Sequence, residues 1–351
     1  MNIEKLFPEF KDNIWGGARL IEKYGKKTDM RPCAESWELS CHKDGSCRIR
    51  DGRLLSEVIG DDEIGKNAVN FPFFPMLIKF IDAKENLSVQ VHPSDSYALK
   101  NENSFGKTEM WYIIEADEGA GIYLGFNNEV TRTEVESAIK GEYLTELLNF
   151  YPVKSGDCFF IPSGTIHAIG SGCLICEIQQ NSNLTYRVYD YGRRDKNGNQ
   201  RELHIEKALT VSDFGKYETK QLTGNLLGIS KYFTVTKMNI TSDTYIPMDG
   251  ATFKCITVVS GQGKLCDEEI SAGDSYFVPA TAKEFVISGS MDVIISEVRN
   301  YFIDIEQSSS EYTATLRDDL GNKISSFTDT DEIGARKKVL SSVNMQESDL
   351  S

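Results

Sequence analysis

The sequence predicts a mostly β protein made of two related β-domains, with a few helices inserted between and beside the strands. Short apolar runs separated by clusters of Gly, Asn, Asp and Pro fill residues 34–154, which is the pattern of an all-β sandwich or barrel. Helical patterns are few. Two segments with the same arrangement of Gly, aromatic residues and Pro lie 117 residues apart, which indicates an internal duplication.

The composition limits the class of protein. The 351 residues, 39.4 kDa in mass, exceed a typical single domain. A net charge of −15 and a pI near 4.9 argue against nucleic acid and anionic membranes as partners. No apolar run approaches the roughly 20 residues of a membrane helix, and the first residues show no export signal, so we expect a cytoplasmic protein. The eight cysteines are expected to be free thiols, because a core of this size needs no disulfides.

The elements follow in order along the chain. Strands are expected at the apolar runs 35–42, 74–83, 87–93, 109–116 and 121–126. A capping box at 131–134 precedes an amphipathic run to residue 139, which predicts a helix, and further helices are expected at 142–150, 202–214 and 331–343. The tail from residue 306 is rich in Ser, Asp and Thr, and is either a small appended motif or partly disordered.

The duplication pairs SGDCFFIPSGTIHAI, from Ser155, with AGDSYFVPATAKEFVI, from Ala272. In both copies Gly-Asp opens a turn, an aromatic strand follows, and Pro comes six residues after the Gly. The copies differ eleven residues after the Gly, where the first has His167 and the second has Glu284. We therefore expect the chemistry to lie in the first copy and the second copy to hold no metal.

The run LSVQVHPSDSY places a possible pair of metal ligands on one strand. Alternate residues share a face of a strand, so Gln90 and His92 point one way while the intervening valines point the other. Their side chains start about 7 Å apart, close enough to converge on one ion. A polar edge of a sheet that faces solvent explains this segment equally well on its own.

A second segment favours the interpretation of Gln90 and His92 as metal ligands over that of a solvent-facing edge. His167 ends the pattern Gly156-x5-Pro162-x-Gly164-x2-His167, in which the glycines and the proline form a tight turn. This pattern resembles the second signature of the cupin superfamily. The first cupin signature, usually His-x-His followed by a Glu, would here be Gln90-x-His92 with Glu109.

Several longer runs resemble one family more closely. They are FPMLIKFIDAKENLSVQVHPSD, GKTEMWYI, QQNSNLTYRVYDYGR, WGG at Trp15 and ESWELS at Glu35. From about residue 5 to 300 the chain resembles type I mannose-6-phosphate isomerase (phosphomannose isomerase) in its short bacterial form. The resemblance implies two cupin (jelly-roll β-barrel) domains and one zinc ion per chain. The ligands that it implies are Gln90, His92, Glu109 and His167. This N/O set leaves a net positive centre with room for water or substrate.

The reaction of that family interconverts mannose 6-phosphate and fructose 6-phosphate by moving a proton between C1 and C2 through an enediol. A cation near the two oxygens stabilises the charge that develops there. The resemblance places Arg187, Lys107 and Lys79 in the active site. We expect Arg187 to stabilise the enediolate, Lys107 to transfer the proton or assist its transfer, and Lys79 to contact substrate or phosphate. Lys79 lies within an apolar strand, where an unpaired charge is costly.

Other polar residues carry weaker expectations. Lys84, Arg193 and Arg194 are further candidates for contact with phosphate, whereas His42 and His204 are expected to be structural.

Two positions depart from the family pattern. Gly106 stands where longer relatives carry a histidine, so a ring-opening role of that histidine must fall elsewhere or to water. Asn183 replaces the usual aspartate before the arginine, and an amide cannot take a proton. Asp190 is the nearest carboxylate in the sequence, although nothing in the sequence directs it at the site.

Three domains are expected. Residues 1–224 would form the N-terminal region and the zinc cupin, with a helical insert at about 131–150; residues 225–300 would form the second cupin; and 301–351 an extension of unknown role. Two other functions fit similar sites: a metal-dependent cupin dioxygenase and a non-catalytic cupin that binds a sugar phosphate. The sequence leaves the oligomeric state open.

Overall fold

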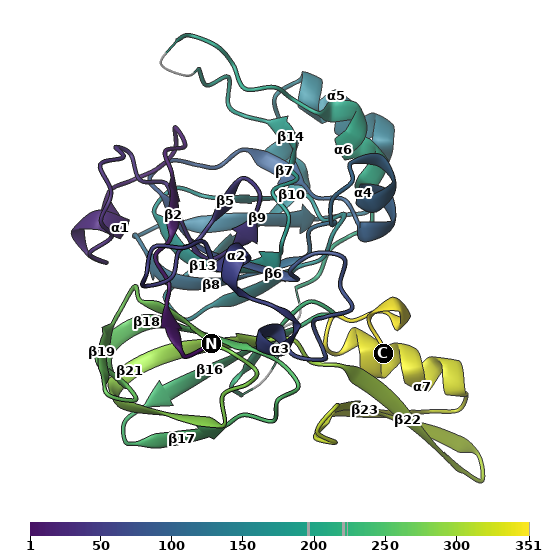
Figure 1. The fold of residues 1–351 in the computed structure, drawn as a ribbon. Coiled ribbons are helices and arrows are strands. Elements are labelled where there is room, and N and C mark those ends of the chain that lie inside the picture. Colours follow the sequence, from purple (N-terminus) through teal and green to yellow (C-terminus); the bar gives the residue numbers. More distant parts are fainter. Residues whose placement is uncertain (195–196, 220–221, 223, 351) are drawn as a thin grey trace. The chain divides into compact units, whose positions relative to one another are not determined.

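The structure, a computed structural model, describes residues 1–194, 197–219, 222 and 224–350. The chain forms two compact units (Figure 1). Unit 1 comprises Met1–Leu6, Ile49–Pro75 and Lys220–Ser351, and unit 2 comprises Phe7–Arg48 and Met76–Thr219. Among the described helices, none has the length and apolar character that a membrane span requires.

Unit 2 contains two antiparallel sheets that share an apolar core. One sheet has the order β11(Cys158–Ile161), β8(Glu109–Ala116), β13(Cys173–Gln180), β6(Met76–Ala83), β3(Glu35–Leu39), β2(Glu9–Lys11). The other has the order β10(Leu148–Pro152), β9(Gly121–Phe126), β12(His167–Ile169), β7(Val89–Val91), β14(Tyr186–Tyr189). The core between them includes Ile81, Ile113 and Ile175 from the first sheet and Ile122 and Ile169 from the second. This sandwich confirms the predicted β class.

The outer face of the five-stranded sheet packs against helices. These are α4(Asp95–Asn101), α5(Arg132–Lys140) and α6(Ile205–Val211), and a short α1(Arg19–Glu22) and the hairpin β4(Cys41–His42)–β5(Gly45–Ser46) lie elsewhere in unit 2. Val89 and Val91 join apolar residues of α5 and α6 in a second core. Because side chains alternate along β7, these valines turn the intervening Gln90 toward the other sheet.

The capping box predicted at Thr131 is present: its hydroxyl accepts from Glu134 N–H, and α5 starts at the next residue. The expectation of a helix over residues 142–150 is wrong. A single 3-10 turn, η1(Leu144–Leu147), is followed by β10, whose Phe150 and Tyr151 pair with Tyr123 and Ile122 of β9. Pairing with a strand distant in sequence outweighs the local helical pattern.

Unit 1 is built on an eight-stranded antiparallel sheet. Its order is β1(Glu4–Lys5), β20(Ser275–Val278), β18(Lys254–Leu265), β21(Glu284–Glu297), β16(Thr234–Ile240), β15(Leu226–Ile229), with β17(Thr244–Pro247) on β21 and β19(Glu268–Ser271) on β18. The segment with α2(Leu55–Val58) and α3(Asp61–Ile64) belongs to this unit, because its backbone bonds to residues 251–253 and 280. Unit 1 therefore takes segments from both ends of the chain and from residues 49–75.

The two copies of the repeat occupy comparable strands. The first supplies β11 and β12, and the second supplies β20 and the start of β21. His167 is fully buried at the start of β12, whereas Glu284 is exposed at the start of β21. The position that carries a candidate ligand in the first copy therefore faces solvent in the second.

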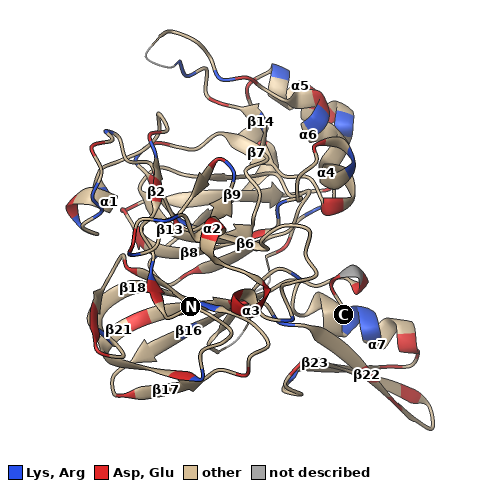
Figure 2. Ribbon diagram, in the orientation of Figure 1, with Lys and Arg blue, Asp and Glu red and all other residues tan. Residues whose placement is uncertain are grey.

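The C-terminal residues form a small ordered motif. The strands β22(Tyr301–Ser308), β23(Glu311–Asp318) and β24(Lys323–Asp329) make a meander on which α7(Glu332–Ser341) packs, followed by the turn η2(Glu347–Asp349). Asp331 caps α7 by accepting from Gly334 N–H, and α7 lies within the helix expected over 331–343. Figure 2 shows both basic and acidic residues on α7, and Lys338 Nζ of this helix lies 2.8 Å from Asp329 Oδ2 of β24.

Candidate active site

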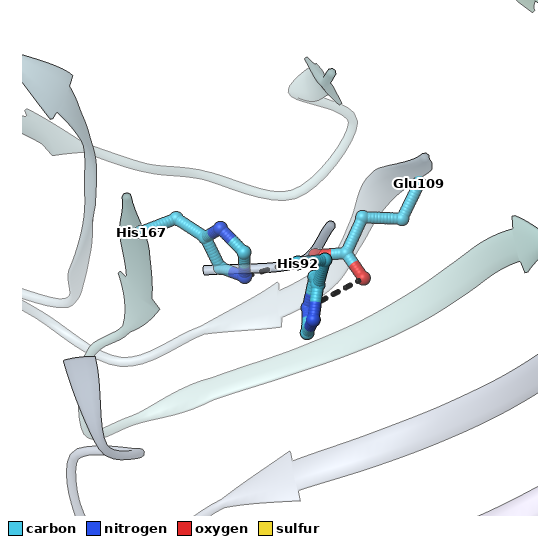
Figure 3. Close-up of side chains that lie close together, drawn as sticks. All are labelled: His92, Glu109 and His167. Atoms are coloured by element: carbon cyan, nitrogen blue, oxygen red, sulfur yellow. Dashed lines mark ion pairs between the residues drawn. The ribbon is translucent and has the colours of Figure 1, made fainter. Parts of the chain in front are cut away.

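Three buried side chains from both sheets of unit 2 converge between them. His92 follows β7, Glu109 begins β8 and His167 begins β12, and their ligand atoms lie within 4.8 Å of one another. Nε2 of His167 is 3.2 Å from Oε1 of Glu109, and Nε2 of His92 is 3.5 Å from Oε2. Figure 3 shows both imidazoles directed at the carboxylate. This arrangement has the residue types and spacing of a metal site.

Hydrogen bonds to the backbone fix the state of both imidazoles. Nδ1 of His92 lies 2.8 Å from Leu184 O, and Nδ1 of His167 lies 2.9 Å from Thr165 O. A carbonyl only accepts, so each Nδ1 carries the hydrogen and each Nε2 keeps its lone pair toward Glu109. Burial lowers the pKa of His167 to about 4 and lowers that of His92 well below its usual value. Both rings are therefore neutral at pH 7, as metal ligation requires.

Glu109 provides the test of whether a cation fits. Both of its oxygens are buried, and neither accepts a hydrogen bond of good geometry, although Lys107 Nζ is only 2.7 Å from Oε2. Burial and the nearby Glu177 raise the pKa of Glu109 to about 7. Lys107 supplies a positive charge at Oε2, but Oε1 is buried facing the lone pair of His167 Nε2 at 3.2 Å, and a metal ion among these groups would remove that cost. The donor set suits a borderline metal such as zinc.

Gln90 lies beside these three residues. In the five-stranded sheet Gln90 is the direct neighbour of His167 on one side and of Arg187 on the other. Its amide Nε2 is 3.4 Å from Nε2 of His167, so rotation of the amide would present its oxygen at the same place. The structure thus brings together all four residues for which the sequence suggested metal ligation.

A cavity of about 270 Å³ adjoins the site within unit 2. It is lined by Asn13, Trp15, Glu35, Lys79, Ile81, Leu87, Ser88, Gln90, Lys107, Glu177, Asn183, Thr185, Arg187, Arg201 and His204. All three residues suggested for catalysis from the sequence, Lys79, Lys107 and Arg187, are among them.

The two lysines form a buried ionic network with a residue that the sequence analysis missed. Lys107 Nζ lies 3.2 Å from His92 Nε2 and 3.4 Å from Oε1 of Glu177. Lys79 Nζ lies 3.2 Å from the same oxygen and 3.5 Å from Glu35. The glutamate thus links both ammonium groups. A lone Glu within the apolar run CLICEIQQ was the available signal, since an unpaired buried charge is costly.

Strand pairing positions this network. Lys79, Glu177 and Trp111 are direct neighbours across β6, β13 and β8, and Trp111 Nε1–H donates to Oε2 of Glu177 at 2.8 Å. Burial alone would raise the pKa of Glu177, but Lys107, Lys79 and the indole N–H outweigh burial and hold this pKa well below its usual value. Glu177 is therefore ionised between the two lysines.

Arg187 extends away from the candidate metal site along β7. Its Nε donates to Ser88 Oγ at 3.2 Å, and its Nη1 donates to Glu202 O at 2.9 Å. Arg201 and His204 line the cavity here as well, although the sequence analysis assigned Arg201 no role and treated His204 as structural. Conversely, Lys84, Arg193 and Arg194 are not among the lining residues.

The departures from the family pattern have local explanations. Asn183 lines the cavity and its Nδ2 donates to Asp44 Oδ2 at 3.0 Å, so an aspartate at 183 would face another carboxylate. Asp190 accepts from Arg193 and Arg201 and does not line the cavity. The structure thus gives Asp190 a role in holding arginines, which does not favour it as a general base.

Gly106 leaves no room for the histidine found in longer relatives. A Cβ at this position would lie 2.5 Å from Asp95 N and Ser94 C and 2.6 Å from Pro93 O, all backbone atoms. Its own N–H donates to Asp95 Oδ1 at 2.8 Å. The backbone after β7 therefore occupies the space that a side chain at residue 106 would need.

Gly106→Ala is expected to lower the free energy of unfolding by about 1–3 kcal/mol, because the added methyl overlaps backbone that cannot move independently. Urea unfolding measures this change. Gly60→Ala is the control, since the same methyl there meets only Glu63 Oε2 at 3.4 Å. Equal small effects in both variants would show that the chain next to Lys107 accommodates a side chain.

The fold and the site together define a cupin with a candidate metal centre. The description "Phosphomannose isomerase type I, catalytic domain" matches residues 3–117, and "Mannose-6-phosphate isomerase, cupin domain" matches 224–298. The chain belongs to the type I phosphomannose isomerase family, as its resemblance indicated.

The similarity to individual relatives agrees with this family membership. The probable mannose-6-phosphate isomerase GmuF of Bacillus subtilis is 38% identical over 311 residues, covering 83% of this chain and 98% of the relative. The mannose-6-phosphate isomerase of Streptococcus mutans is 37% identical, covering 81% and 94%. The crystal structure of the mannose 6-phosphate isomerase from B. subtilis has a TM-score of 0.76 at 33% identity, covering 84% of this chain and 99% of that one.

Proposed function

We propose that the protein is a zinc-dependent aldose–ketose isomerase that interconverts mannose 6-phosphate and fructose 6-phosphate. The observation that carries this proposal is the buried cluster of His92, Glu109 and His167 beside a cavity lined by lysine and arginine. Relatives named as mannose-6-phosphate isomerases support the choice of substrate.

The ligands that we propose for zinc are Gln90, His92, Glu109 and His167. When bound there, the ion would supply a Lewis acid next to the O1 and O2 oxygens, on which negative charge develops. The neutral imidazoles and the carboxylate of Glu109 leave the ion with net positive charge, which suits this role.

The surrounding side chains would handle the proton and the remaining charge. A base removes the proton from C2 of the aldose, and the same proton returns to C1 of the resulting enediol to give the ketose. We propose that Lys107 transfers this proton or assists its transfer. To act as the base, its ammonium must first pass a proton to Oε1 of Glu177, which lies 3.4 Å away. Arg187 would stabilise the enediolate, and Lys79 would contact the substrate from the floor of the cavity.

We also propose that the domains along the chain have different roles. The first cupin, within residues 1–224, would carry catalysis; the second, residues 225–300, would serve as a metal-free partner; and residues 301–351 form an extension outside the matched cupin region. Among the described residues, the three-residue group suited to a metal lies in the first cupin.

The test of the proposed function combines metal analysis with an assay of turnover. The protein purified with zinc is expected to convert mannose 6-phosphate to fructose 6-phosphate, measured by a coupled assay, to lose activity on chelation and to regain it with zinc. Absence of ketose with zinc bound would refute the isomerase. Oxygen consumption with iron bound would indicate a cupin dioxygenase, and binding of mannose 6-phosphate without turnover would indicate a non-catalytic sugar-phosphate-binding cupin.

A further inference from the structure

The cavity has a second cationic region, separate from the lysines near the candidate metal site. Arg187, Arg201 and His204 line this part, and all three come from β14 or from the connection between β14 and α6. Figure 2 shows basic and acidic residues together along this connection. The proposed mechanism gives a role to Arg187 only. The presence of Arg201 and His204 in the cavity therefore needs a separate explanation.

Arg201 is held in a fixed orientation by a carboxylate. Its Nε and Nη2 donate to the two oxygens of Asp190 at 2.8 and 2.5 Å, and Asp190 is itself nearly buried and also accepts from Arg193 Nη2 at 2.5 Å. In the described part of the chain, Nη1 of Arg201 has no hydrogen-bond partner. A guanidinium fixed in this way presents its remaining donors without a further loss of side-chain entropy.

His204 presents a donor of defined tautomer. Its backbone N–H donates to Arg187 O at 2.7 Å, and its Nδ1 accepts from Arg187 N–H at 3.3 Å. Because Nδ1 accepts, the hydrogen of the neutral ring is on Nε2. The nearest carboxylate oxygen, Oε2 of the largely exposed Glu202, is 3.8 Å from Nε2, beyond hydrogen-bond distance. Nε2–H is therefore available to a ligand in the cavity.

The charges around Asp190 do not balance among themselves. Arg193 and Arg201 both donate to Asp190, and Arg193 Nη1 also lies 3.9 Å from the exposed Glu85. The guanidinium of Arg187 donates to Ser88 Oγ and to Glu202 O, neither of which carries a charge. Burial and then repulsion from Arg201 lower the pKa of Arg187 below its usual value, although Asp190 acts to raise it. A phosphate monoester carries nearly two negative charges at pH 7, so it would complement the excess positive charge of this cluster.

The spacing along β7 fits a sugar phosphate. Gln90 pairs with Arg187 across the strands, but the Arg187 guanidinium reaches Ser88, two residues before Gln90. Two residues of extended strand correspond to about 7 Å. A six-carbon chain with its carbonyl end at the candidate metal site would therefore bring the phosphoryl group on C6 toward Arg201 and His204.

We infer that Arg201 and His204 form the subsite for the phosphoryl group of the substrate, next to Arg187, which keeps its assignment to the enediolate. This inference rests on the proposed function for the identity of the sugar, but the anion subsite itself is defined by Arg201 and His204. Arg201 and His204 contact the phosphoryl group and take no part in the proton transfer.

The experiment compares Arg201→Met with Arg194→Met in the zinc-bound protein. Arg194 is exposed, donates to Gly198 O and lies outside the cavity, so it controls for the loss of one positive charge. Calorimetry with inorganic phosphate is expected to show about 10- to 100-fold weaker binding for Arg201→Met and little change for Arg194→Met. Arg201→Lys is expected to bind with intermediate affinity, because it keeps the charge without the planar fork.

Steady-state kinetics provide the second measurement. Arg201→Met and His204→Ala are expected to raise the KM for mannose 6-phosphate much more than they lower kcat, with zinc content unchanged. Equal phosphate affinity in the Arg201 and Arg194 variants would overturn the subsite. Because calorimetry needs no turnover, weaker phosphate binding in a protein that fails to isomerise mannose 6-phosphate would reject the proposed function and support the subsite.

Discussion

Replacing His167 with Ala is expected to abolish metal binding and isomerase activity while the fold persists. The side chain is fully buried, its Nε2 lies 3.2 Å from Glu109, and its Nδ1 is anchored to Thr165 O. Without it, an ion keeps at most three of the four proposed ligands, and the carboxylate of Glu109 loses a neighbour. We expect zinc content near zero after dialysis and activity reduced by about 1,000-fold or more. Metal analysis, the coupled assay and circular dichroism test these three points.

The repeat supplies a matched control for this substitution. Glu284 occupies the same place in the second copy but is exposed, so Glu284→Ala is expected to leave zinc content and activity unchanged. Gln90→Ala is expected to have an intermediate effect, about 10- to 100-fold weaker zinc binding, because a neutral amide oxygen is the weakest of the proposed ligands. Full zinc occupancy and activity in the His167 variant would show that the ligand set is wrong.

Replacing Lys79 with Met is expected to cause the largest loss of stability. Lys79 is buried between Glu177 and Glu35, and its ammonium lies 5.6 Å from the centre of the Trp37 ring. Burial alone would lower its pKa, but Glu177, Glu35 and Glu109 raise it above the usual value, so the side chain is charged. Its removal leaves buried carboxylates without their partner, at a cost of about 3–5 kcal/mol. Urea unfolding at fixed zinc concentration measures this change.

Two further variants test whether an uncompensated buried charge causes the loss of stability in Lys79→Met. Lys79→Met combined with Glu177→Gln is expected to recover part of the lost free energy of unfolding, since the uncompensated charge is removed together with its partner. Lys140→Met, on the exposed end of α5, is expected to change stability by less than about 0.5 kcal/mol. If the double variant is no more stable than Lys79→Met, the charge of Glu177 is not the source of the instability.

Local patterns predicted much of the fold. Alternation of apolar and polar residues in LSVQVHP predicted which side of β7 is apolar and packed, and the core around Val89 and Val91 confirms this. The capping box at Thr131 correctly marked the start of α5, and α7 lies within the helix expected over 331–343. The family resemblance, carried by short motifs, is confirmed by the family models and by relatives at 35–38% identity.

Other features depended on residues that are distant in the sequence. Residues 148–150 lie within the helix expected over 142–150, yet they belong to strand β10 because β9 offers them backbone partners. Glu177 becomes important only because β13 lies between the strands that carry Lys79 and Trp111. Arg201 gains its orientation from Asp190, eleven residues earlier, and no periodicity in the sequence connects the two.

The sequence by itself determined the β class, the duplication, the family and the residue types of a metal site, because these depend on local spacing and on motifs. The tertiary structure decided which charges neutralise one another, where Arg201 and His204 face, and why Gly106 has no side chain. These depend on distances between strands and loops that only the folded chain brings together, and charges and close contacts act over a few ångströms of space, whatever the separation in sequence.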